Sequence, residues 1–122
     1  RSRDGVGVLM EGARLFKAQP LPDQLGVDIV LFDLEDYGPH QDEAELYYDE
    51  SVNHWALGSQ YWSKHPHVYG YKAYYGILLD MVGGSNPNFQ KEYFSQGYAA
   101  WVINKVWRKA SDLGYRPYFT NE

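Results

Sequence analysis

The feature that most constrains the fold of this chain is a short apolar segment that runs directly into two adjacent carboxylates. In residues 27–36, a nearly continuous apolar run is followed by Glu35 and Asp36. Such a run is typical of a strand that is buried on both faces of a parallel sheet. Carboxylates at the end of that strand would lie at the carboxyl edge of the sheet, where open α/β folds build their binding sites.

A second segment repeats this arrangement. Residues 74–79 are mostly apolar and lead into Asp80 and a turn-forming run at 83–88. The helix-then-strand order of the chain predicts an α/β domain with a parallel sheet. For each segment alone, the acid can equally be a helix N-cap or a turn former. The pair of Glu35 and Asp36 favours a site, because neighbouring carboxylates repel unless a cation or a proton lies between them.

Composition and charge argue against several classes of protein. The 122 residues are enough for one domain with its own core. A net charge of −5 without a basic cluster argues against nucleic-acid binding, which requires Lys and Arg to neutralise phosphates. No apolar stretch approaches the roughly 20 residues of a membrane span. There is no cysteine, so disulfides and thiolate metal ligands are excluded.

Apolar residues at helical spacing predict three helices, over residues 5–16, 55–64 and 96–113. Asp4 is expected to cap the first helix, and Gly114 is expected to end the third. Trp101 and Trp107 widen the apolar stripe of the third helix and are expected in the core. The remaining segment, residues 37–54, is acidic and aperiodic and is predicted to be a long surface loop.

Two weaker motifs receive structural interpretations. His65 and His67 flank a proline, and histidines in such a loop are more often solvated than bound to a metal. Gly83 and Gly84 resemble a phosphate-binding loop only superficially, because no Lys-Ser or Lys-Thr pair follows them. Neither motif is assigned a ligand.

Four motifs along the chain carry a resemblance to a known family. They are Phe32–Gly38, Leu57–Trp62, Gly76–Gly83 and Asn86–Phe89. In this order they resemble zinc-dependent exopeptidases of the bacterial leucyl aminopeptidase type, including their glutaminyl-cyclase-like branch. The resemblance implies a three-layer α/β/α fold with a mostly parallel sheet, incomplete here at both ends. It implies that residues 1–122 are a single fragment of the catalytic domain.

The resemblance also assigns roles to the three acids. Glu35 matches the general acid/base, which takes a proton from the metal-bound water or the substrate amine. Asp36 matches a zinc ligand. Asp80 matches either a ligand of a second zinc ion or an acid in a hydrogen-bond network, so one or two zinc ions are implied and no other cofactor. Asp33 is expected only to order the site.

Other ligands of the family are missing from these residues. The family's first His-x-Asp motif and its late histidine have no match in the chain, and Arg1 stands where a metal-bridging aspartate is expected. We therefore expect a central piece of a longer enzyme, with little activity alone and with exposed sheet edges that favour self-association. The parent enzyme would act on peptide N-termini and be secreted or periplasmic. The alternatives are a glutaminyl-peptide cyclotransferase, or a non-catalytic α/β binding module that retains the scaffold.

Overall fold

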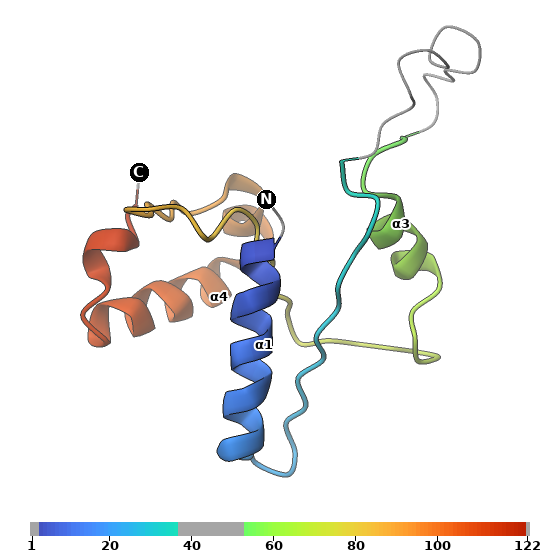
Figure 1. The fold of residues 1–122 in the computed structure, drawn as a ribbon, viewed down its shortest axis with the longest axis horizontal. Helices are drawn as coiled ribbons and strands as arrows, with labels where there is room; N and C mark the ends of the chain where they lie inside the picture. The colour runs from blue at the N-terminus through green and yellow to red at the C-terminus, as the bar shows by residue number, and fades with distance from the viewer. Residues whose placement is uncertain (1–2, 37–52, 122) are drawn as a thin grey trace, which may run out of the picture. The chain divides into compact units, whose positions relative to one another are not determined.

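The computed structural model describes residues 3–36 and 53–121, which form helices joined by irregular segments (Figure 1). The helices are α1 (Arg3–Ala18), α3 (Leu57–Lys64) and α4 (Tyr93–Asp112), followed by the short 3-10 helix η1 (Arg116–Tyr118). The three helices predicted from apolar spacing are therefore confirmed. The predicted acidic loop, residues 37–54, falls almost entirely outside the described residues.

The chain divides into two compact units. One contains Arg1–Pro20 and Ala73–Glu122, and the other contains Leu21–Lys72. Helices α1 and α4 belong to the first unit, and α3 belongs to the second. In consequence, Glu35 and Asp36 lie in one unit, whereas Asp80 lies in the other.

Helix α1 carries charges that suit its dipole. Asp4 lies in the first turn and Lys17 in the last, where each charge opposes the partial charge of the nearer helix end. Asp4 lies within the helix rather than at the predicted N-cap position, and its side chain is close to Gly83. On the exposed face, Arg14 donates two hydrogen bonds to Glu11 and thereby lowers the pKa of that carboxyl.

Helix α4 is defined by specific signals at both ends. Glu92 is its N-cap and accepts hydrogen bonds from the amides of Phe94 and Ser95, which lower the pKa of the Glu92 carboxyl. At the other end, Gly114 adopts a φ of 83° and donates to the Ser111 carbonyl oxygen. Together with the next amide along the chain, this bond forms the Schellman pattern that the glycine predicted.

The buried residues of the described chain lie mainly on α4. Val102, Ile103 and Ala110 are less than one-tenth exposed. Trp107 is half-buried, whereas Trp101 is 56% exposed, so the prediction that Trp101 lies in the core is wrong. Trp101 instead makes an edge-to-face contact with a tyrosine of the same unit.

A small aromatic cluster of Phe89, Trp107 and Phe119, called here the aromatic seam, lies at the C-terminal end of the first unit. Phe89 and Phe119 form a parallel β-bridge, with their rings 5.0 Å apart. The Trp107 ring meets Phe119 edge-to-face at 5.3 Å, and its indole N–H donates a 2.8 Å hydrogen bond to the Thr120 carbonyl oxygen. This seam attaches the residues after η1 to helix α4.

Neither predicted strand is formed within the described residues. Residues 27–34 and 73–80 have no regular secondary structure, and most of their apolar side chains are exposed, including Leu31 at 62% and Leu78 at 83%. Figure 1 shows the first segment running as an extended stretch into the region of α3. A strand buried on both faces requires neighbouring strands and covering helices, and the described residues do not provide them here. The two predicted strands are therefore not formed in the described residues, and the sheet that would bury them stays a prediction.

Candidate functional site

The acidic pair lies at a bend that helix α3 holds in place. Glu35 and Asp36 are exposed and follow Leu34, whose φ of 50° lies in the left-handed region. The Ala56 amide donates a 3.0 Å hydrogen bond to the Glu35 carbonyl oxygen. The Leu57 amide donates a second 3.0 Å bond to the Leu34 carbonyl oxygen. Two amides at the start of α3 are thus satisfied by the backbone next to the pair, which fixes where that backbone lies.

Gly58 allows α3 to approach this bend closely. A Cβ atom added at Gly58 would lie 2.6 Å from the Asp33 carbonyl oxygen and 3.0 Å from the Asp33 backbone nitrogen. It would also lie 2.5 Å from a carboxylate oxygen of Asp33. Only glycine therefore fits at this position of the first helical turn. Asp33 therefore lies against the first turn of α3, and its expected role in ordering the site stays a prediction.

Asp80 occupies a similar setting in the other unit. It is exposed and precedes Met81, which has a φ of 50°. Gly5, in the first turn of α1, is buried against the residue before Asp80: an added Cβ would lie 2.7 Å from the Leu79 carbonyl oxygen. A helix thus touches the backbone beside Asp80 through a glycine, as α3 does near Glu35. Sequence reasoning missed both glycines; the Gly-Ser pair of the 57–62 motif was the only signal.

Glu35 and Asp36 are consecutive residues and lie at one bend, two and three residues after Asp33. Each unit is defined by itself, so a shared site that also includes Asp80 stays a prediction. In residues 3–36 and 53–121, no three His, Cys, Asp or Glu side chains gather in an arrangement that could hold a metal ion. The carboxylates present suit zinc in kind, but a catalytic zinc normally takes three protein ligands.

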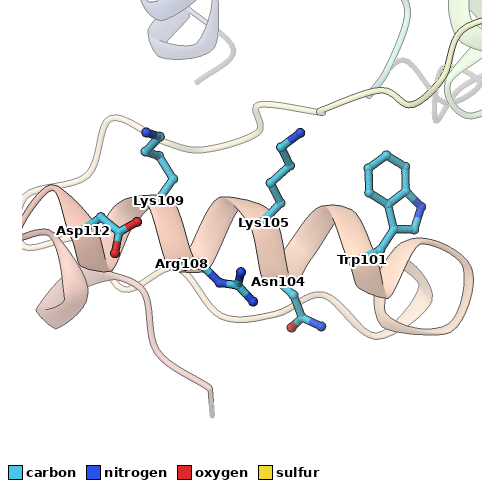
Figure 2. Close-up of a pocket in the computed structure, with 6 residues that line it drawn as sticks. All are labelled: Trp101, Asn104, Lys105, Arg108, Lys109 and Asp112. Carbon is cyan, nitrogen blue, oxygen red and sulfur yellow. The ribbon is translucent and has the colours of Figure 1, made fainter.

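A mostly apolar hollow lies next to the acidic pair. It is formed between residues 30–34 and the first two turns of α3, and it is lined on the helix side by Leu57, Gly58, Tyr61 and Trp62. A second hollow runs along α4 and is shown in Figure 2. There Lys105 and Lys109 extend to one side of the helix and Arg108 to the other. None of the three predicted site acids lines either hollow.

An aromatic cluster supports the bend from the same unit. Trp62, on α3, meets Phe32 edge-to-face at 5.8 Å and donates a 3.3 Å hydrogen bond to Nδ1 of His67. The Tyr71 hydroxyl donates a 3.0 Å hydrogen bond to Asp28, which raises the pKa of Tyr71. His67 therefore has a structural role in this cluster. The high aromatic content of residues 55–75 was the only sequence signal for it.

Comparison with known proteins places these features in a family. The family model of peptidase family M28 matches residues 4–119. The chain belongs to this peptidase family. No curated protein matches it.

Solved structures resemble the chain over nearly its whole length. A leucine aminopeptidase precursor from Bacteroides thetaiotaomicron is 48% identical, with a TM-score of 0.82 over 97% of this chain. A Zn-dependent exopeptidase from Parabacteroides distasonis is 47% identical, with a TM-score of 0.82 over 96%. A glutaminyl cyclase from Bacteroides thetaiotaomicron, bound to N-acetylhistamine, is 48% identical, with a TM-score of 0.82 over 97%. The chain covers 38–39% of these three proteins, so it spans about two-fifths of their length.

Proposed function

We propose that the full-length protein containing this chain is a zinc-dependent aminopeptidase that hydrolyses the N-terminal residue from peptides. The observation that carries the proposal is the bend at Glu35 and Asp36, because two amides at the start of α3 bind the backbone beside two adjacent, exposed carboxylates. Membership of peptidase family M28 and 48% identity to a leucine aminopeptidase precursor support it. The isolated chain is expected to show little activity, because the residues that the structure describes do not gather three metal ligands.

Within this proposal the three acids have different tasks. Glu35 acts as the general base that takes a proton from the attacking nucleophile and returns it to the leaving amine. Asp36 and Asp80 would hold zinc, together with ligands from outside residues 1–122. Zinc in such a site supplies a Lewis acid that polarises the substrate carbonyl.

The proposed fold of the full-length enzyme is a three-layer α/β/α domain with a mostly parallel sheet, of which this chain is one part. The exposed apolar side chains of residues 27–34 and 73–80 support it, because they have the composition of strands that are covered on both faces. Until those strands are covered, self-association through the exposed segments is expected.

In the described residues, no helix is both long and apolar enough to span a bilayer. A secreted or periplasmic location for the parent enzyme is part of the proposal.

A second candidate function is cyclisation of N-terminal glutamine. The observation in its favour is that the chain is as similar to a glutaminyl cyclase as to a leucine aminopeptidase precursor, with 48% identity in each case. In this reaction the substrate's own amine replaces water as the nucleophile, and Glu35 would accept its proton. Asp80 would then belong to a hydrogen-bond network rather than hold a second zinc ion.

The test uses the full-length gene product with its metal content measured. Zinc binding and turnover of aminoacyl-anilides and of glutaminyl peptides are compared for Glu35→Gln, Asp36→Asn and a control, Glu11→Gln, on the exposed face of α1. Glu35→Gln should lower kcat by about 10²–10⁴-fold on whichever substrate is used and leave zinc bound. Asp36→Asn should lower zinc affinity, and the control should change neither quantity. Full activity of Glu35→Gln, or no zinc in the wild type, would refute the proposal.

A further inference from the structure

Near two of the three site acids, Glu35 and Asp80, a glycine in the first turn of a helix lies against the backbone just before the acid. Gly58 of α3 lies against Asp33, two residues before Glu35, and Gly5 of α1 lies against Leu79, one residue before Asp80. We propose that Gly58 and Gly5 are positioning residues, which set the backbone that carries each acid. The proposal rests on the assignment of Glu35 and Asp80 to the site and adds the element that holds each of them.

The contacts are too close for any side chain at the glycine position. At Gly58 an added Cβ would meet the Asp33 carbonyl oxygen at 2.6 Å, whereas ordinary contact begins at 3.4 Å. Relief of this overlap requires a movement of about 0.8 Å, the difference between the two distances. Because the atom that is met belongs to the backbone, a change of side-chain rotamer cannot supply this movement.

The movement would be passed on to Glu35 by the two hydrogen bonds from α3. The Ala56 and Leu57 amides donate to the carbonyl oxygens of Glu35 and Leu34, so α3 and the bend are joined directly beside the overlap, on the side of Glu35. A shift of either partner then changes where the Glu35 carboxyl lies. Misplacement of a reacting group by about 1 Å can lower a rate about 10²-fold.

The helices themselves do not require these glycines. Neither Gly58 nor Gly5 has a positive φ, so alanine can adopt the same backbone and would favour the helix. The chain also provides matched controls. Gly7 on α1 and Gly97 on α4 are helical glycines at which an added Cβ meets nothing within 4 Å. Alanine at these two positions tests the loss of glycine without the close contact.

The experiment measures kcat, KM and bound zinc for Gly58→Ala, Gly5→Ala, Gly7→Ala and Gly97→Ala in the full-length protein. The first two should lower kcat about 10–100-fold with KM changed less than about threefold. The two controls should match the wild type. Amide hydrogen exchange at Ala56 and Leu57 gives a readout without turnover, and both amides should exchange faster in Gly58→Ala.

A double-mutant cycle separates positioning from a general structural effect. If Gly58 acts through Glu35, adding Gly58→Ala to Glu35→Gln should lower kcat by less than about twofold further. An equal loss in both backgrounds, or an unchanged kcat in Gly58→Ala, overturns the proposal. An active Glu35→Gln instead refutes the proposed function, and the positioning role of Gly58 is refuted with it.

A second background covers the case in which Gly58→Ala folds poorly. Ala56 has a φ of 53°, so Ala56→Gly relieves strain next to the contact and keeps both amide donors. Gly58→Ala in this background should fold and still show the lower kcat. Failure to fold in both backgrounds gives Gly58 a purely structural role and overturns the proposal.

Discussion

The C-terminal aromatic seam makes a quantitative prediction about Trp107. Its half-buried ring meets Phe119 edge-to-face, and its indole N–H donates a 2.8 Å hydrogen bond to the Thr120 carbonyl oxygen. Trp107→Phe keeps an aromatic ring but removes this donor, which costs about 0.5–1.5 kcal/mol for the hydrogen bond alone. Loss of the larger ring adds to this, so we expect a decrease of about 2 kcal/mol in the free energy of unfolding. Trp107→Ala also removes the ring contact and should cost about 3–5 kcal/mol.

The assay is urea unfolding followed by circular dichroism, with the slope of the transition compared between variants. Trp101→Phe is the control, because Trp101 is 56% exposed and should cost less than about 0.5 kcal/mol. If the dependence of the unfolding free energy on urea concentration is the same in all variants, the differences between their midpoints report stability alone. Equal losses for Trp107→Phe and Trp101→Phe would refute the reasoning, since the seam would then contribute nothing specific to the stability of the unit.

Three further predictions concern titration and strain. The pKa of Glu92 is lowered because it accepts hydrogen bonds from the amides of Phe94 and Ser95, so its stabilising contribution is present above pH 4.5 and is lost as the pH falls through the lower folded pKa. Urea midpoints measured between about pH 6 and about pH 3 should fall less in Glu92→Gln than in the wild type. The hydrogen bond to Asp28 raises the pKa of Tyr71, so the contribution of Tyr71 to the free energy of unfolding is present below pH 10.0 and is lost as the pH rises through the higher folded pKa. Urea midpoints measured above about pH 9 should therefore fall less in Tyr71→Phe than in the wild type. Met81 has a φ of 50° and is 73% exposed, so Met81→Gly should raise the free energy of unfolding by about 0.5 kcal/mol, and a loss of 1 kcal/mol would contradict this.

The helices could be predicted from the sequence because their signals are local. Apolar spacing located α4, and Gly114 marked its end because few other residues adopt a positive φ. Its start was placed three residues too late, at Gln96 instead of Tyr93. Glutamate is not among the preferred N-cap residues, so Glu92 gave no signal, although it binds two amides of the first turn.

The strands could not be predicted in the same way, because pairing and burial depend on other segments. The apolar pattern of residues 27–34 is that of a buried strand, but the described residues place no partner strand along it and leave Leu31 largely exposed. Trp101 shows the same limit: it lies on the apolar stripe of its helix, but it is 56% exposed. The pattern predicts which residues can be buried, and the rest of the fold decides which of them are.

For the site, the sequence predicted the acids but not what holds them. The spacing of Glu35, Asp36 and Asp80 after apolar segments was visible, and the assignment of their roles stays a prediction. The contacts of Gly58 and Gly5 depend on how closely a helix approaches the backbone, which no local pattern encodes. A glycine in the first turn of a helix normally indicates only a lower helix propensity.

Backbone strain gives the positioning argument independent support. Leu34, directly before Glu35, and Met81, directly after Asp80, both have a φ of 50°. A residue that is not glycine costs about 1–3 kcal/mol in this region, and it persists only where the surroundings fix it. At Leu34 the surroundings are known: its carbonyl oxygen and that of Glu35 accept hydrogen bonds from the Leu57 and Ala56 amides, and α3 approaches the residue before Leu34 closely at Gly58. The strained residue therefore lies among three residues, 33–35, that two hydrogen bonds and one close approach of α3 hold. This arrangement is expected where the position of a carboxylate matters more than the stability of the bend.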